Sequence, residues 1–254
     1  MFAHAARIVR PLLVAVFLLL LLQAAEWLDV LPLSLPPPAA LAAALGRDAG
    51  LLLANTLVTL QAAVIGYAIA ILGSAVLIAL VAFLPRLEAV VYNAALVMHT
   101  LPLIVIAPIL VIWFGLGIET RVIISSLSAY YAILIGGLNG LHASAGRAQE
   151  LMHVLSASKW QAFTKVTVPY ALPALFAGLK VGSAGAILGA VVAEWAGAET
   201  GLGVMMSNSL FSFQVERVWL TMLMMMIVSV VVYFSVQQLE RRVLRWTRPA
   251  SEAA

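Results

Sequence analysis

The sequence predicts an all-α fold, a polytopic bundle of about six membrane-spanning helices. Of its 254 residues, 64% are hydrophobic and only 10% are charged, whereas soluble domains carry about 25% charged residues. A helix needs about 20 mainly apolar residues to cross a bilayer. Runs of that length lie at about 11–30, 51–84, 89–115, 121–141, 171–193 and 218–239. Because backbone groups cannot stay unpaired in lipid, each run is expected to cross as a helix.

The first run follows two arginines, a pattern that cleaved signals and retained spans share. Arg7 and Arg10 precede the apolar stretch Leu12–Leu22, as in a secretory signal. No small-x-small cleavage site follows this stretch, so we expect a retained span, and the sequence alone leaves cleavage open. After it, the alanine-rich second half of Pro32–Gly50 predicts a short helix lying along the membrane surface.

The distribution of lysine and arginine predicts the orientation of the chain. Basic residues near the ends of spans favour the cytoplasmic side. With the N-terminus inside, ten of the 14 basic residues lie on inner segments. Arg47, Arg121 and Arg217 lie outside, and Lys180 lies within a span. Both termini are therefore expected in the cytoplasm. No nucleic-acid partner is expected, because the basic residues are at span ends and not on one polar face.

Three segments organise the chain. Residues 1–50 hold the first span and an extracytoplasmic connection. Residues 51–242 form the core, with the other five spans and a long inner loop, 142–170, between the fourth and fifth. Residues 243–254 are a basic cytoplasmic tail, whose charges are explained by attraction to anionic lipid.

The residues that carry enzyme chemistry are missing or scattered. There are no cysteines, and His4, His99, His142 and His153 show no metal-ligand spacing. The nucleotide-binding pattern G-x-x-x-x-G-K-[ST] does not occur, and neither does H-E-x-x-H or G-x-S-x-G. We expect no catalytic residue, no metal and no bound cofactor on this chain.

The loop 142–170 predicts two short amphipathic helices. Their apolar faces consist of Leu151, Val154 and Leu155 in the first helix, and of Trp160 and Phe163 in the second. Ser158 followed by Gln161 fits a capping box, which restarts the helix after a break. Pro169 is expected to end the second helix, and Pro173 suits the first turn of the next span. The result is a compact helical knob on the cytoplasmic side.

The same loop resembles a known membrane-protein motif. It reads Glu150-Leu-Met-His-Val-Leu-Ser-Ala-Ser158 and continues to Val166-Thr-Val-Pro169. This spacing resembles the EAA loop of binding-protein-dependent ABC importer permeases, whose pattern is E-A-A, three residues, G, nine residues, I-x-L-P. Leu151-Met152 replace the paired alanines, which suggests an altered groove in the partner. Ser156 replaces the glycine and must reach the turn without glycine's conformational freedom.

The resemblance extends over most of the chain. The stretches that carry it are Leu101-Pro102 with Ala107-Pro108, Trp113-Phe-Gly-Leu-Gly117, Ala171-Leu-Pro173 to Gly178-Leu-Lys-Val181, and Ala193-Glu-Trp-Ala-Gly-Ala198 with Gly201-Leu-Gly203. They are similar to the subgroup that moves nitrate, sulfonates, taurine or pyrimidine thiamine precursors. The sequence motifs Gly-Leu-Lys-Val and Ala-Glu-Trp-x-Gly-Ala most resemble those of the pyrimidine-precursor permeases. The resemblance implies an inner-membrane permease for a small solute.

In that family the loop is a coupling helix seated in a cleft of a cytoplasmic ATPase, and the resemblance implies the same role here. The implied ATPase-coupling residues are Glu150, Leu155, Ser156, Ala157, Ser158, Lys159, Trp160, Phe163 and Pro169. The implied partners are an ABC ATPase, which uses ATP and Mg²⁺, an extracytoplasmic solute-binding protein and a second copy of the chain. The residues alone leave open a loop that lies on lipid headgroups.

Polar groups inside the predicted spans mark candidate positions on a solute pathway, because such groups are costly in lipid. The candidates are Asn93, His99, Thr100, Pro102 and Glu194. Pro102 and Pro108 predict a bent helix that frees backbone groups towards a cavity. A histidine bonded to a neighbouring carbonyl is an equal alternative for His99. Glu194 is expected at an outer gate or, preferably, in solvent, and Lys180 is expected to snorkel to the inner surface.

Glycines on the fifth predicted span predict a close helix contact. Gly178, Gly182, Gly185 and Gly189 share one helical face, so another backbone can approach closely. The sequence leaves open whether that backbone belongs to the same chain or to a second copy.

A different class of function, an ion-coupled secondary transporter, predicts carboxylates at mid-membrane and an inverted repeat. Neither is found in the sequence.

Overall fold

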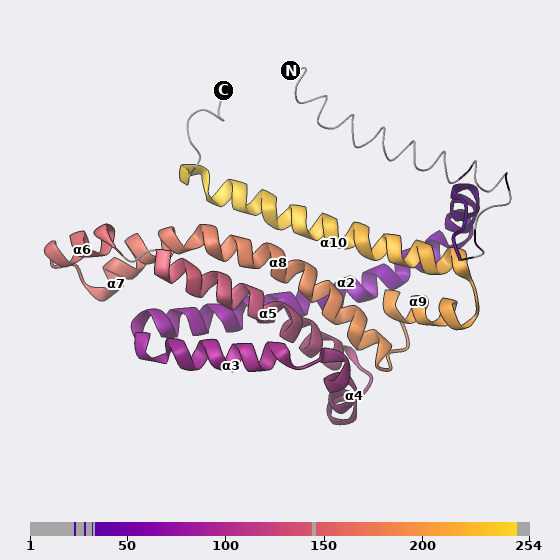
Figure 1. Cartoon of the computed structure of the whole chain (residues 1–254), viewed down its shortest axis with the longest axis horizontal. Helices are drawn as coiled ribbons and strands as arrows, with labels where there is room; N and C mark the ends of the chain where they lie inside the picture. Colours follow the sequence, from indigo (N-terminus) through magenta and orange to yellow (C-terminus); the bar gives the residue numbers. More distant parts are fainter. Residues whose placement is uncertain (1–22, 24–27, 29–31, 33, 144–145, 248–254) are drawn as a thin grey trace, which may run out of the picture.

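The computed structural model is a bundle of helices with no strand among the residues that it describes (Figure 1). Those residues are all except 1–22, 24–27, 29–31, 33, 144–145 and 248–254. Most of the predicted first span, 11–30, and most of the basic tail lie outside the described residues. The all-helical prediction is confirmed.

Four long helices form the body. They are α2 (Pro38–Phe83), α5 (Ile118–Ala143), α8 (Val168–Trp195) and α10 (Val215–Val243). Shorter helices join them: η1 (Pro85–Leu87), α3 (Glu88–Thr100), α4 (Leu103–Phe114), α6 (Arg147–Val154), α7 (Lys159–Ala162), η2 (Phe163–Thr167) and α9 (Leu202–Phe211). A last turn, η3 (Arg245–Thr247), follows α10. Figure 1 shows α6 and α7 at one end of the molecule and α9 at the other.

Four helices in the described part of the chain are each long and apolar enough to cross a membrane, and Lys159–Trp195 counts as one of them. Pro85–Thr100 and α4 pass the same test when they are taken together, but they meet at a 90° bend and so form either a broken fifth span or a re-entrant loop. The predicted run 89–115 therefore agrees in extent with these two helices, and it is bent as predicted. The bend is where Pro102 predicted it. Leu101, which precedes the proline, is extended at φ −70° and ψ 124°, because a following proline disfavours the helical region.

The helix predicted within Pro32–Gly50 is present, but it is not a separate element. α2 runs unbroken for 46 residues, so the alanine-rich segment and the second span form one helix. At 1.5 Å per residue its length is about 70 Å, more than the roughly 30 Å of a hydrocarbon core. Gly46 and Gly50 do not interrupt it. Figure 1 shows its indigo first turns inclined to the purple remainder.

The centre of the bundle is the contact between α5 and α8, and the predicted glycine stripe makes it. A Cβ on Gly185 would lie 2.9 Å from the carbonyl oxygen of Ser128, and one on Gly189 would lie 2.8 Å from that of Ile124. Gly178 and Gly182 face Ala132 and Ile133 of α5 in the same way. The close contact that the glycines predicted is therefore made within the chain.

Two ion pairs tie α10 to the rest of the bundle. The Lys180 ammonium lies 2.8 Å from Glu240 Oε2, and both side chains are largely buried. The prediction that Lys180 snorkels to the inner surface did not include this partner on α10, which the sequence did not reveal. At the other end of α10, Arg217 donates two hydrogen bonds to Asp48 of α2, at 2.8 and 3.0 Å.

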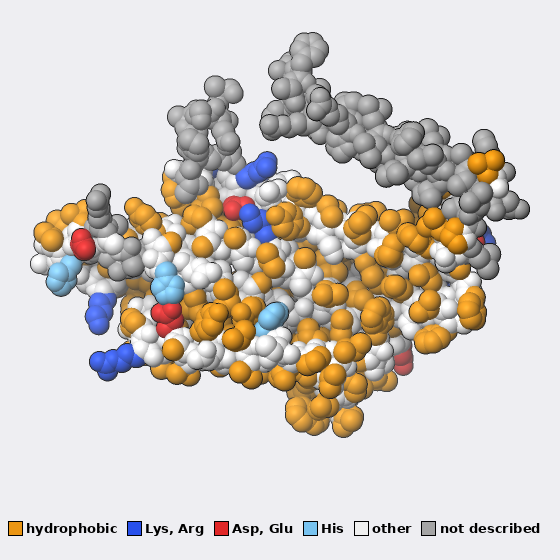
Figure 2. Space-filling view, viewed as in Figure 1, with side chains coloured by type: hydrophobic (Ala, Val, Ile, Leu, Met, Phe, Trp, Pro, Cys, Tyr) orange, Lys and Arg blue, Asp and Glu red, His pale blue; other side chains and the backbone are white. Residues whose placement is uncertain are grey.

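Charged side chains are unevenly distributed over the face in Figure 2. Hydrophobic side chains cover its middle, while the described charged groups gather near α6 and α7 and near the end of α10. A broad apolar surface with most charged groups gathered towards the end that holds α6 and α7 is expected of a membrane protein, in which basic residues lie at the ends of spans.

Candidate functional site

The turn after α6 is held by a glycine-type cap without a glycine. Ser156 has a φ of +51°. Its N–H donates to the carbonyl of His153, and the N–H of Ala157 donates to that of Met152, both at 3.0 Å. These two bonds define a Schellman motif, in which the residue with positive φ is usually glycine. Ser156 occupies this position as predicted, at a cost of about 1 kcal/mol.

The next helix starts at the predicted capping box. The Ser158 hydroxyl accepts a hydrogen bond from the Gln161 N–H at 3.2 Å, and the Gln161 side-chain oxygen accepts one from the Ser158 N–H at 2.9 Å. The break between α6 and α7 thus has a cap on each side. Five residues, 154–158, are fixed by local hydrogen bonds, so this turn is stiff.

Pro169 does not end the second helix, contrary to prediction. The helix widens to a π turn over Phe163–Thr167 and continues as α8. The Val168 N–H donates to the carbonyl of Phe163, five residues back. Proline cannot donate the usual bond and clashes with the carbonyl four residues earlier, and the wider turn accommodates it. Pro173 consequently lies inside α8 and not in its first turn.

The α6–α7 turn presents apolar side chains to its surroundings. Val154 is 79% exposed, Leu155 65% and Trp160 62%. Glu150 and Lys159 are exposed beside them, as are Ser156 and Ser158, while Ala157, Phe163 and Pro169 are partly buried. Exposed apolar groups on a rigid, polar-edged turn are typical of a surface that another protein covers.

Two of the predicted ATPase-coupling residues, Trp160 and Phe163, pack on Phe83, which sequence reasoning missed. The Trp160 ring stacks on Phe83 with centroids 6.2 Å apart, and the Phe163 ring lies 5.0 Å from the same ring. Phe83 is the last residue of α2, and only its position just before Pro85 and Arg86 in the sequence hinted at this end of the span. These three rings join the α6–α7 turn to α2, so the main role of Phe163 is to pack within the chain.

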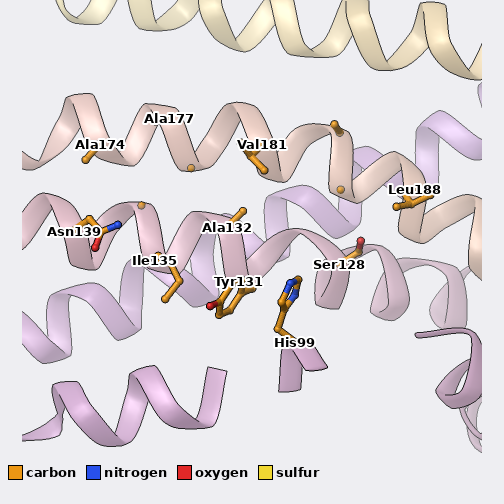
Figure 3. Close-up of a pocket in the computed structure, with 14 residues that line it drawn as sticks. His99, Ser128, Tyr131, Ala132, Ile135, Asn139, Ala174, Ala177, Val181 and Leu188 are labelled. Carbon is orange, nitrogen blue, oxygen red and sulfur yellow. The ribbon is translucent and has the colours of Figure 1, made fainter. Parts of the chain in front are cut away.

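A cavity of about 790 Å³ lies along α5 and α8 and reaches His99 at the end of α3 (Figure 3). Of the predicted pathway residues, the structure brings only His99 to its wall. Asn93 is exposed elsewhere on α3, the Thr100 hydroxyl donates to the carbonyl of Val97, and Pro102 forms the bend. The other polar lining groups are Ser128, Tyr131 and Asn139, all from α5.

His99 is stacked on an aromatic ring. Its imidazole lies parallel to the Tyr131 ring, with centroids 4.1 Å apart and planes 7° apart. The alternative of a histidine bonded to a neighbouring helix carbonyl has no such bond among the described contacts. Sequence reasoning missed Tyr131, which gave no signal beyond being an aromatic residue inside a span.

Glu194 is buried and does not line this cavity. The expectation that it lies in solvent was therefore wrong, while its place at an outer gate stays a prediction. Its side chain is 1% exposed. One carboxylate oxygen accepts from the Thr59 hydroxyl and the other from the Gly203 N–H, each at 2.7 Å. The Thr59 hydroxyl in turn accepts from the Leu202 N–H at 2.8 Å. Glu194 and Thr59 thus satisfy the donors at the start of α9, where a carboxylate is favoured.

Glycines let the chain come this close to the carboxylate. Gly201 has a φ of +131°, and a Cβ there would collide with Glu194. Its N–H donates to the side-chain oxygen of Asn55 at 2.8 Å. Side chains from two spans therefore anchor three successive N–H groups. We name this set, Asn55, Thr59, Glu194, Gly201 and Gly203, the Glu194 cluster.

Comparison with known proteins identifies what these features belong to. Residues 70–245 match the family model described as "Binding-protein-dependent transport system inner membrane component". The chain belongs to this family. The match covers α5, the α6–α7 turn, α8 and α9. The turn lies inside it, and so do Glu194, Gly201 and Gly203 of the Glu194 cluster, whereas Asn55 and Thr59 precede it. These permeases are inner-membrane subunits of ABC importers, and the alternative of an ion-coupled transporter is therefore set aside.

Individual relatives agree with this assignment. A "Probable ABC transporter permease protein" of Haemophilus influenzae is 31% identical over 93% of this chain and 97% of its own length. A "Formylaminopyrimidine transport permease protein" of Halalkalibacterium halodurans is 30% identical over 75% of this chain and 76% of its own. A "Riboflavin transport system permease protein" of Chloroflexus aurantiacus is 29% identical over 84% and 80%.

Proposed function

We propose that this chain is the membrane half of an importer in which the α6–α7 turn is seated in a cleft of a separate ATPase. The observation that carries the proposal is the turn itself, capped on both sides and presenting Val154, Leu155 and Trp160 to the outside. A rigid turn can transmit a movement of the ATPase to the membrane helices, and its exposed apolar side chains can supply the binding energy of the contact. ATP and Mg²⁺ are then bound by the partner, and not by this permease.

Orientation and assembly follow from this role. The α6–α7 turn faces the cytoplasm together with both termini, and the α9 end faces the extracytoplasmic side, where a binding protein delivers the solute. Two copies pair around the pathway, with the open side of the cavity towards the second copy. The solute is a small molecule of the pyrimidine-precursor, sulfonate, taurine or nitrate type. Relatives named for the transport of formylaminopyrimidine, aliphatic sulfonates and taurine support the first three types.

Charge substitution in the turn tests the coupling role. Leu155→Asp and Glu150→Lys should each lower the amount of ATPase that co-purifies with the permease by about tenfold or more, as expected for a central interface residue. Solute uptake should fall in parallel. Leu155 is a cleaner probe than Trp160, because Trp160→Ala also removes the stacking on Phe83.

Two control variants make the result specific. Leu155→Met keeps the apolar contact and should retain the ATPase. Phe213→Asp introduces the same charge on a residue 89% exposed at the α9 end, and should also retain it. Unchanged ATPase recovery in both Leu155→Asp and Glu150→Lys would refute the coupling role of the turn.

A further inference from the structure

We propose that the cavity between α3, α5 and α8 binds an uncharged, planar ring compound, and that this is the class of solute the permease moves. The inference rests on the proposed transport function and selects among its solutes. It excludes oxyanions such as sulfonates and nitrate as the main cargo. Three features of the cavity wall support it: its charge, its stacked rings and its size.

The described wall of the cavity contains no Lys or Arg that could pair with an anion. None of the fourteen described residues that line the cavity is Lys, Arg, Asp or Glu. Anions in proteins are bound by Arg, Lys or the N–H groups at helix starts. The one lining residue near a helix end, His99, is in the last turn of α3, where the carbonyl ends carry partial negative charge. An oxyanion in this cavity would lose its hydration and gain only neutral hydrogen-bond donors in return, with no opposite charge.

Lys180, the basic residue closest in sequence to the lining residues, points away from the cavity. Lys180 stands between the lining residues Gly178 and Val181, yet its ammonium is bound to Glu240 of α10. Figure 3 shows α5 and α10 on opposite sides of α8, and none of the labelled lining side chains lies between α8 and α10. The charge of Lys180 is thus neutralised on the far side of its helix.

The stacked rings of His99 and Tyr131 give the wall a flat aromatic surface. His99 and Tyr131 lie parallel at 4.1 Å, so this part of the wall already accommodates flat groups face to face. A planar solute gains from such stacking beyond the area that it buries. The Asn139 amide and the Ser128 hydroxyl, farther along α5, supply hydrogen bonds for ring nitrogens and exocyclic groups.

The size of the cavity fits a small organic solute. Its volume of about 790 Å³ is within the roughly 300–1,000 Å³ of ligand pockets. A lipid chain would need no polar lining, and polar side chains inside spans are costly unless they serve a ligand or a partner. The four polar residues on an otherwise apolar wall therefore favour a ring compound over an acyl chain.

Uptake by the complete transporter tests this solute class. Proteoliposomes containing the full chain with its ATPase and binding protein are supplied with labelled formylaminopyrimidine or labelled taurine. We expect ATP-driven accumulation of the pyrimidine and not of taurine. Tyr131→Leu should lower pyrimidine uptake about tenfold, while Tyr131→Phe, which keeps the ring, should stay within about twofold.

The readouts separate solute contact from general damage. In Tyr131→Leu, ATP hydrolysis stimulated by the binding protein and recovery of the ATPase should stay within about twofold of the unmodified protein. Tyr233→Leu, the same change on α10 away from the cavity, should leave both uptake and hydrolysis unaltered. Accumulation of taurine without the pyrimidine, or full pyrimidine uptake by Tyr131→Leu, would overturn the solute class. Both results would leave the coupling role standing, because that role depends on Leu155 and Glu150.

Discussion

The two ends of the helix from Lys159 to Trp195 are built in opposite ways. At the α6–α7 end, apolar side chains are exposed and the backbone is capped by its own neighbours. At the α9 end, a carboxylate is buried, and side chains of other spans satisfy the backbone. The first end keeps its contacts available for a partner, whereas the second uses its contacts within the chain. Disturbing the first should therefore affect assembly, and disturbing the second should affect stability.

The largest effect is expected at Glu194. Glu194→Leu leaves the buried Gly203 N–H without its acceptor and the Thr59 hydroxyl with only the Asn55 carbonyl, 3.1 Å away. We expect a cost of about 3 kcal/mol in the free energy of unfolding. Thermal unfolding of the purified permease should show a clearly lower Tm, while recovery of the ATPase from the remaining folded protein is unchanged. If Glu194→Leu kept the original Tm but lost the ATPase, the contrast between the two ends would be wrong.

The second effect concerns the backbone of the same cluster. Gly201→Ala places a Cβ against the Glu194 carboxylate at a φ of +131°, so we expect a loss of about 2 kcal/mol. Gly73→Ala is the matched control, because nothing lies within 4 Å of a Cβ at this helical position. It should stabilise the protein by about 0.5–1 kcal/mol. Equal Tm values for the two variants would remove the steric role of Gly201.

A smaller effect is expected midway along the helix, where Lys180 pairs with Glu240. Lys180→Met alone leaves a largely buried carboxylate without its partner, and Glu240→Gln added to it removes that charge. Because the two groups are in contact, their effects should not add, and a double-mutant cycle of Tm values should give a coupling of about 1 kcal/mol. Additive effects would show that the pair contributes nothing.

The smallest effect is expected at the exposed end. Ser156→Gly relieves the positive φ but adds freedom to the unfolded chain, so the net gain in stability should be about 0.5 kcal/mol. ATPase recovery should stay as it is, because the turn keeps its shape. Ser156→Val, a β-branched residue at the same φ, should instead weaken ATPase binding. A Val variant with normal recovery would show that the shape of the turn does not matter.

Local features of this molecule could be predicted from the sequence, and distant pairings could not. The Ser158 capping box, the strained Ser156 and the bend at Pro102 each depend on residues a few positions apart, and all three are confirmed. The fate of Glu194 depended on Thr59, 135 positions away, and that of Lys180 on Glu240, 60 positions away. A single sequence contains no signal that joins such pairs.

Two further differences have local causes that pattern reasoning weighed wrongly. Pro169 was expected to end a helix because it lacks an N–H, but a helix can also widen around a proline. The glycines of α8 predicted a close contact correctly, although their spacing did not reveal that the facing helix was α5. In both places the residue type indicated the constraint, and the packing decided how it was met.

The π turn at Phe163–Thr167 also sets the direction in which the α6–α7 turn points relative to α8. Each residue of an α-helix rotates the chain by about 100°, and a π turn holds one more residue than an α turn. Removing that residue would swing Leu155 and its neighbours to a different side of the bundle while every local cap survived. The direction in which the α6–α7 turn projects from the bundle is thus set by one additional residue.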